Sequence, residues 1–354
     1  MGLPEIFIAF ETAAVSAISR SARGVLAVVL AGGASEAGED GENSLPAARA
    51  YRSLAEVSKE DFSPEDYRRL ELAFLAGPSK VLALNAAERD TDTFAALERL
   101  SFDWLAAPSL DGGQVVSFIR SRRAKGIGVK AVVADAPAPD HEGIVNLCAS
   151  GLELNDGPVT AKDYTVRIAG LLAALPLTRS ATYAALPEVV SCGGLEDPDR
   201  AVDAGKLILV PGRDGYKLGR AVNSFTSTTV DKAAPFQKIK IVEGIDLIRT
   251  DIARAFENSY IGRVLNDYDN KLLLVTAINA YLHGLEGDVL DKTADNRCFI
   301  SLDGQRTYLE ARGLDTSGMK DTEILRANTG SEVFLDANLT FCDAMEDLSL
   351  RISM

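Results

Sequence analysis

The first half of the sequence alternates short, continuously apolar runs with longer amphipathic or polar stretches. Runs of this kind are typical of strands buried on both faces, and they occur at residues 25–30, 81–86, 104–107 and 129–134. Helices are expected between them, at residues 64–77, 91–100 and 114–125. Ser63 suits the N-cap of the first helix, and Pro64 suits its first position. The alternation predicts a layered α/β domain with a mostly parallel sheet.

A second unit is expected after the proline-rich stretch at residues 137–139, because 354 residues are about twice the usual size of one domain. Its first helix is predicted at residues 160–175. Two strands are predicted around the turn at 212–215, and the second of them extends to residue 228. Two further helices follow, and the first carries apolar residues at helical spacing: Ile241, Ile245, Ile248, Ile252 and Phe256.

Both ends of the chain carry amphipathic strand patterns with no hairpin partner beside them. The N-terminal pattern places Ile6, Ile8 and Phe10 on one face. The C-terminal pattern runs in two parts, with the apolar positions Val333, Leu335, Leu339 and Phe341, then Leu348, Leu350 and Ile352. An isolated strand needs a partner, which is either a distant strand of the same chain or a strand of another chain. The pattern alone leaves both alternatives open.

The composition limits the partners and the location of the protein. A formal net charge of −14 disfavours binding to nucleic acid or to an anionic membrane surface. The most apolar helix, at residues 168–177, is too short to span a bilayer, so we expect no membrane insertion. The first residues show no signal-peptide pattern, so we expect a cytoplasmic protein that leaves a cell by lysis or assembly. The scattered cysteines are typical of reduced thiols: Cys148, Cys192, Cys298 and Cys342.

Catalytic and ligand-binding motifs are missing from the sequence. The loop with Gly32 and Gly33 lacks both the dinucleotide glycine pattern and the lysine of a phosphate loop. No Gly-x-Ser-x-Gly motif occurs, and neither histidine is placed as a base or shares zinc-ligand spacing with a cysteine. Asp267 and Asp269 lack the glycine and glutamate of a calcium loop and are expected to cap a helix. We therefore expect a structural protein that has no catalytic residue and binds no metal or cofactor.

Two groups of basic residues stand out on this acidic chain. The first lies at the end of the helix predicted at 114–125, where cations offset exposed carbonyls, and it is interpreted as a solvated helix end: Arg120, Arg122, Arg123 and Lys125. The second comprises two pairs on later helices, and these are candidate docking charges for an acidic partner: Lys238 and Lys240, and Lys320 and Arg326.

Several motifs, spread over nearly the whole chain, resemble the contractile tail sheath subunits of Gram-positive phages, defective prophages and phage-tail-like bacteriocins. They are Gly2-Leu-Pro-Glu-Ile6, Arg20-Ser-Ala-Arg-Gly24, His141-Glu-Gly-Ile144, Arg167-Ile-Ala-Gly170, Arg220-Ala-Val-Asn-Ser224, Phe236-Gln-Lys-Ile-Lys-Ile-Val242, Tyr260-Ile-Gly262, Tyr268-Asp-Asn-Lys271, Ala327-Asn-Thr-Gly330 and Asp343-Ala-Met-Glu-Asp347. The resemblance implies a two-domain α+β subunit in which an outer α/β domain is inserted into an inner domain built from both chain ends. The implied boundaries are an N-terminal arm at 1–22, the outer domain at 23–150, the inner core at 151–329 and a C-terminal β arm at 330–354.

The resemblance also implies an assembly and its partners. Subunits form stacked hexameric rings around a tail tube, and the terminal strands reach neighbouring subunits, which makes their apolar residues interface residues. The tail tube, baseplate and terminator proteins are the other implied partners, and one pair of basic residues would face the tube. Contraction would drive the tube through a cell envelope without nucleotide. A subunit lacking residues 331–354 is then expected to fold but not to assemble.

Two other functions compete with this one. An α/β enzyme or nucleotide-binding protein would hold a small phosphorylated ligand near Gly32 and Gly33, and would show saturable nucleotide binding. A tail-tube or baseplate subunit shares the assembly context but would not need more than 300 residues with an inserted domain.

Overall fold

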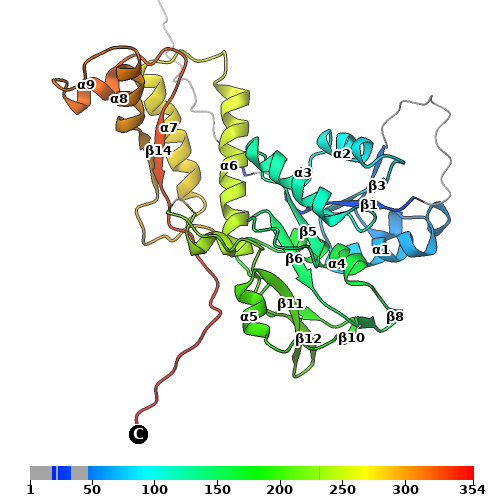
Figure 1. The fold of residues 1–354 in the computed structure, drawn as a ribbon. Coiled ribbons are helices and arrows are strands. Elements are labelled where there is room, and N and C mark those ends of the chain that lie inside the picture. Colours follow the sequence, from blue (N-terminus) through cyan, green and yellow to red (C-terminus); the bar gives the residue numbers. More distant parts are fainter. Residues whose placement is uncertain (1–17, 21–22, 33–46, 231) are drawn as a thin grey trace, which may run out of the picture. The chain divides into compact units, whose positions relative to one another are not determined.

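The computed structural model describes residues 18–20, 23–32, 47–230 and 232–354 (Figure 1). The N-terminal residues Ile6, Ile8 and Phe10 lie outside the described residues. The chain divides into two compact units. One contains residues 21–250 and 343–354, and is called here the α/β unit; the other contains residues 1–20 and 251–342, and is called the helical unit.

A nine-stranded sheet forms the centre of the α/β unit, in the order β2-β3-β1-β4-β5-β6-β11-β12-β9. Its middle is parallel, and comprises β3 (Lys80–Asn85), β1 (Val25–Leu30), β4 (Trp104–Ala106), β5 (Lys130–Ala134), β6 (Ile144–Cys148) and β11 (Lys206–Gly212). Antiparallel strands flank it: β2 (Ala48–Tyr51), β12 (Gly215–Leu218) and β9 (Ala185–Leu186). The predicted mostly parallel sheet is confirmed. The sheet continues past residue 150, where the sequence predicts a boundary between two domains. This domain boundary stays a prediction.

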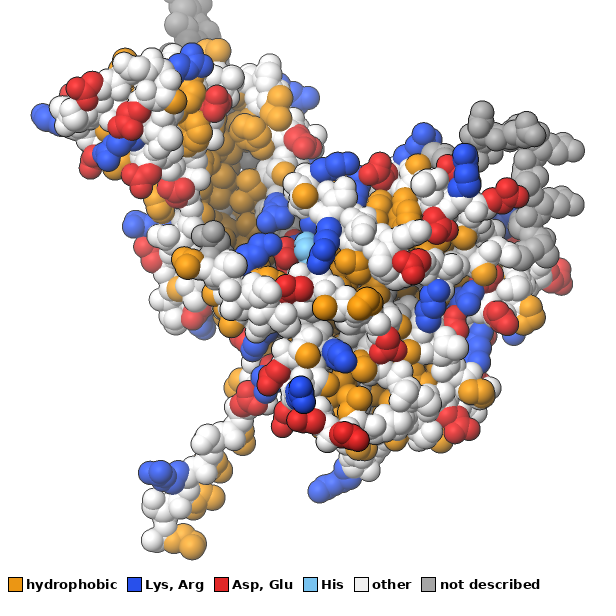
Figure 2. Space-filling model, in the orientation of Figure 1, with side chains coloured by type: hydrophobic (Ala, Val, Ile, Leu, Met, Phe, Trp, Pro, Cys, Tyr) orange, Lys and Arg blue, Asp and Glu red, His pale blue; other side chains and the backbone are white. Residues whose placement is uncertain are grey.

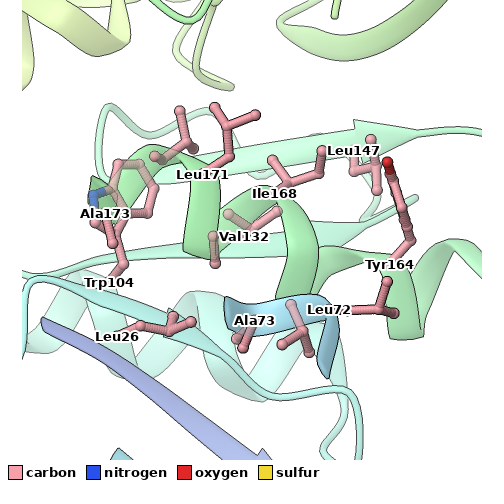
Figure 3. Packing of buried hydrophobic residues seen from close by; sticks show 14 of the residues in the cluster. Leu26, Leu72, Ala73, Trp104, Val132, Leu147, Tyr164, Ile168, Leu171 and Ala173 are labelled. Carbon is pink, nitrogen blue, oxygen red and sulfur yellow. The ribbon is translucent and has the colours of Figure 1, made fainter. Parts of the chain in front are cut away.

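Helices cover both faces of this sheet, because successive side chains of a buried strand point to opposite sides. On β1, Leu26, Val28 and Leu30 pack with the first helix layer, while Ala27 and Val29 pack with the second. The first layer contains α1 (Pro64–Phe74) and α4 (Ala161–Ala174), and the second contains α2 (Asp90–Glu98) and α3 (Gly112–Ala124). Figure 3 shows the first core, where side chains of α1 and α4 meet those of the strands.

The two helices of the first layer approach each other closely at a glycine. A Cβ atom added at Gly170 of α4 would overlap the backbone carbonyl of Ala73 in α1, which cannot rotate away. We expect Gly170→Ala to lower the free energy of unfolding of the α/β unit by about 1–3 kcal/mol, the usual cost of overpacking. Urea denaturation followed by the fluorescence of Trp104, the single tryptophan of the chain, measures this change.

The matched control for this substitution is Gly112→Ala at the start of α3, where an added Cβ meets no atom within 4 Å. A helical glycine with open space should tolerate alanine, with a change of less than about 1 kcal/mol in the stabilising direction. Equal midpoints for Gly170→Ala and the wild type would show that the two helices are not in close contact.

The remaining elements of the α/β unit are short. A three-stranded sheet comprises β10 (Val189–Ser191), β7 (Glu153–Leu154) and β8 (Gly157–Pro158). Short helices are α5 (Pro198–Asp203) and the 3-10 turns η1 (Leu54–Glu56), η2 (Lys59–Asp61) and η3 (Ala234–Gln237). The strand predicted to reach residue 228 ends at Leu218, so that prediction is wrong for residues 219–228. Helix α6 (Ile239–Ser259) begins in this unit and ends in the other.

The helical unit continues from α6 with α7 (Tyr268–His283), β13 (Arg297–Ile300), α8 (Leu302–Ala311), α9 (Asp321–Arg326) and β14 (Leu335–Asn338). Asp267 caps α7, as the sequence predicts, because its carboxylate accepts from the N–H of Asn270 at 2.8 Å. The buried ammonium of Lys271 is held by Gln305 at 2.7 Å and Thr329 at 2.9 Å, which ties α7 to α8 and to the segment after α9.

Candidate assembly surface

The last residues of the chain expose a row of apolar side chains. Residues 343–354 contain no helix or strand, and the exposed fractions are 89% for Leu348, 72% for Leu350 and 76% for Ile352. Figure 1 draws this segment as an extended chain, and Figure 2 shows hydrophobic side chains along it. Alternate apolar residues on an extended segment without a partner strand are typical of a strand that pairs with another chain.

The preceding residues are paired within the helical unit. Leu335 lies opposite Ile300 in the antiparallel pair of β14 and β13, and Phe341 forms a bridge with Leu290. Val333, Leu335, Leu339 and Phe341 are all half-buried. Within the described chain, β13 and β14 are paired as strands only with each other. On the outer side of β13, the side chain of Asn279 in α7 hydrogen-bonds the N–H and the C=O of Cys298, so the strand edge left open is that of β14. The C-terminal pattern of the sequence therefore contains one strand paired within its own chain and one extended segment that pairs with no strand among the described residues.

The candidate docking charges lie on two different elements. Lys238 and Lys240 lie at the start of α6; Lys238 forms ion pairs with Asp343 and Glu346 of the same chain. Lys320 and Arg326 lie at opposite ends of α9 and are exposed. The backbone N–H of Lys320 donates to Glu323 at 2.9 Å, and the guanidinium carbon of Arg326 lies 5.0 Å from the centre of the Tyr268 ring.

A group of buried charges attaches the first half of α6 to the sheet. The carboxylate of Asp246 accepts from Arg123 of α3 at 2.7 Å and from Lys130 of β5 at 3.1 Å, and all three side chains are buried. Glu243 adds an ion pair with Lys130 at 3.1 Å and another with Arg23. The interpretation of Arg123 as part of a solvated helix end is therefore wrong: its partner lies 123 residues away.

The protonation of this group follows from burial and from its neighbours. Burial alone would raise the pKa of Asp246, but Lys130 and Arg123 outweigh it and lower the pKa to about 2. Burial lowers the pKa of Lys130 to about 8 despite the attraction of Asp246. At neutral pH both groups are charged, so Asp246 is an ionic link between α3, β5 and α6.

Metal sites, membrane-spanning helices and ligand cavities are the features that would indicate other functions, and they are sparse among the described residues. They contain no cluster of three His, Cys, Asp or Glu side chains suited to a metal ion. In the part of the chain that the structure describes, no helix is both long and apolar enough to cross a bilayer. A cavity of about 290 Å³ lies at the carboxyl ends of β4 and β5, near the first turns of α3 and α4. Its polar lining includes Lys162 and Asp135, and nothing in it points to a particular ligand.

Comparison with known proteins identifies several relatives. Residues 231–292 match the phage tail sheath C-terminal domain family. The chain is 33% identical over 374 aligned residues to the tail sheath protein of Clostridium phage phiCD119, covering 100% of this chain and 99% of that protein.

Solved structures share its fold. The sheath tail protein from Desulfitobacterium hafniense superposes with a TM-score of 0.68 at 17% identity, covering 84% of this chain and 94% of that one. The helical sheath of the anti-feeding prophage in its contracted state superposes with a TM-score of 0.69 at 14% identity, covering 100% and 99%. The likeness extends over both units of this chain.

Proposed function

Because this chain belongs to the phage tail sheath protein family, we propose that it polymerises as stacked hexameric rings around a tail tube and contracts to drive that tube through a target cell envelope. The observation that supports polymerisation most directly is the exposed apolar row at Leu348, Leu350 and Ile352, together with the open edge of β14. A subunit with an unpaired strand and an unpaired edge is complementary to a second copy of itself.

The linkage between subunits is strand addition. The segment with Leu348, Leu350 and Ile352 adds to the open edge of the β13–β14 pair of a neighbouring subunit, and the N-terminal arm with Ile6, Ile8 and Phe10 adds to another edge. Main-chain hydrogen bonds hold the added strand, and the alternation of its apolar side chains sets the register. Each apolar side chain that leaves water contributes about 1.5–3 kcal/mol. Residues Val333, Leu335, Leu339 and Phe341 then belong to the receiving strand and its continuation.

Contact with the tail tube is carried by Lys320 and Arg326. These residues are exposed on one short helix, whereas Lys238 already has two carboxylate partners in its own chain. A few exposed charges give a contact that holds the extended sheath and still releases during contraction. Baseplate and terminator proteins cap the two ends of the sheath, and the particle assembles in the bacterial cytoplasm and leaves by lysis.

Contraction needs no nucleotide in this mechanism. The globular bodies repack between two arrangements while the terminal arms keep neighbouring subunits connected as hinges. The sequence supports this account, since the loop after β1 lacks the lysine of a phosphate loop.

Negative-stain electron microscopy of the purified protein tests the proposal. We expect wide, ridged, hollow cylinders at protein concentrations high enough for the arms to bind neighbouring subunits. A protein that stays monomeric across concentration and salt series, or that forms only thin tubes of the tail-tube kind, would contradict it.

A further inference from the structure

The C-terminal arm is bound to the body of its own subunit just before its exposed apolar row. The carboxylate of Glu346 is only 7% exposed and accepts hydrogen bonds from four side chains. One oxygen accepts from Ser180 at 3.0 Å and from Thr182 at 2.6 Å; the other accepts from Arg220 at 3.1 Å and from Lys238 at 3.5 Å. All of these residues belong to the α/β unit.

Two flanking carboxylates use the same cations. The guanidinium of Arg220 also donates to Asp347 at 2.6 Å, and the ammonium of Lys238 also pairs with Asp343. Burial alone would lower the pKa of Lys238, but Asp343 and Glu346 outweigh it and raise the pKa. The hydrogen bond from Arg220 lowers the pKa of Asp347. The acidic positions 343, 346 and 347 are therefore all matched by donors on the body.

The body presents these donors on a fixed framework. An antiparallel bridge between Val222 and Lys238 places the backbone next to Arg220 beside the start of α6. The hydroxyl oxygen of Thr182 accepts from the N–H of Ala221 at 2.9 Å, so the hydroxyl proton is directed to Glu346. The site is held in place by contacts that do not involve the C-terminal segment.

Charge and hydrogen bonds hold the segment, and apolar burial does not. Met345, in the middle of the bound stretch, is fully exposed. Binding by charge-assisted hydrogen bonds is specific for carboxylates at this spacing and is weakened by salt.

We propose that Ser180, Thr182, Arg220 and Lys238 form a binding site for the acidic segment at residues 343–347, and that this site fixes the point from which the arm leaves the subunit. The inference rests on the proposed function in one respect, namely that residues 348–354 act as the connecting arm. With residues 343–347 held, the free arm begins at Leu348 and pivots after Asp347. A shorter free segment raises the effective concentration of the arm at the neighbouring strand edge.

Limited proteolysis of the full-length monomer with thermolysin tests this site, since the enzyme cleaves before Met345, Leu348, Leu350 and Ile352 alike. A protease needs several extended, mobile residues around the cut. In the wild type we expect rapid cleavage before Leu350 and Ile352 and slow cleavage before Met345. Glu346→Gln removes the charge from four hydrogen bonds, and should accelerate cleavage before Met345 at least tenfold. Mass spectrometry of the products at successive times gives both rates.

The control is Glu196→Gln, which changes an exposed glutamate in the same unit and should leave both rates unchanged. Arg220→Gln is a second variant that should have the same effect as Glu346→Gln, and the urea transition of Trp104 confirms that each variant is folded. The proposal would be overturned if the wild type were cleaved before Met345 as fast as before Leu350. It would also be overturned if neither Glu346→Gln nor Arg220→Gln accelerated cleavage before Met345.

The same samples separate this inference from the proposed function. A protected segment in a protein that forms no cylinders would refute the proposed assembly and leave the binding site intact. Cylinders formed by a protein in which residues 343–347 are cleaved rapidly would support the proposed assembly and refute the binding site.

Discussion

Removal of residues 348–354 is expected to abolish assembly into cylinders while the subunit stays folded. The deleted residues include the exposed side chains of Leu348, Leu350 and Ile352 and make no strand within the chain. Deletion therefore removes the arm without uncovering a core. A longer deletion from residue 331 would also remove β14, which pairs with β13, and its effect on assembly could not be separated from damage to the helical unit. Sedimentation velocity and negative-stain microscopy measure the outcome.

A substitution series on the same segment distinguishes side-chain burial from chain length. Replacing Leu348, Leu350 and Ile352 together by serine should prevent assembly as the deletion does, because an added strand would bury no apolar surface. Arg351→Ser changes the opposite face of the same extended segment and should still assemble. Cylinders of normal length from the truncated protein would show that the C-terminal arm is not the link.

The sequence predicts the central sheet well because its signals are local. Continuous apolar runs mark β1, β3, β4 and β5, and Ser63 marks the start of α1. In the helical unit, Asp267 marks the start of α7 in the same way. Each of these signals depends on residues within one or two turns of chain. Burial on both faces then follows from composition alone.

Contacts between distant residues leave no such signal. In the sequence, Arg123 is one of several basic residues at a helix end. Its contact with Asp246 forms only when the chain folds. Glu346 lies in a motif of the C-terminal segment, and its partners Ser180 and Lys238 are more than 100 residues away. The same limit applies to the C-terminal pattern, since alternation predicts strands but does not say which part pairs at home.

Asp246→Ala is expected to lower the free energy of unfolding of the α/β unit by about 3–5 kcal/mol. The substitution leaves Arg123 and Lys130 buried without the carboxylate that lies 2.7 Å and 3.1 Å from them. Arg123 retains an ion pair with Glu142 and Lys130 retains one with Glu243. The ammonium of Lys130 also lies 5.4 Å from the ring of Trp104. Urea denaturation followed by tryptophan fluorescence therefore reports directly on this part of the fold.

Asp156→Ala is the matched control, because Asp156 pairs with Arg68 at 2.9 Å but is largely exposed. An exposed ion pair contributes about 0–1 kcal/mol, so this variant should have nearly the same free energy of unfolding as the wild type.

The difference in free energy of unfolding between Asp246→Ala and the wild type should also depend on pH. The lowered pKa of Asp246 stabilises the folded state above its ordinary value near 4, and that contribution is lost as the pH falls towards about 2. A difference that is small at neutral pH, or that grows in acid, would show that the buried carboxylate does not hold α6 to the sheet.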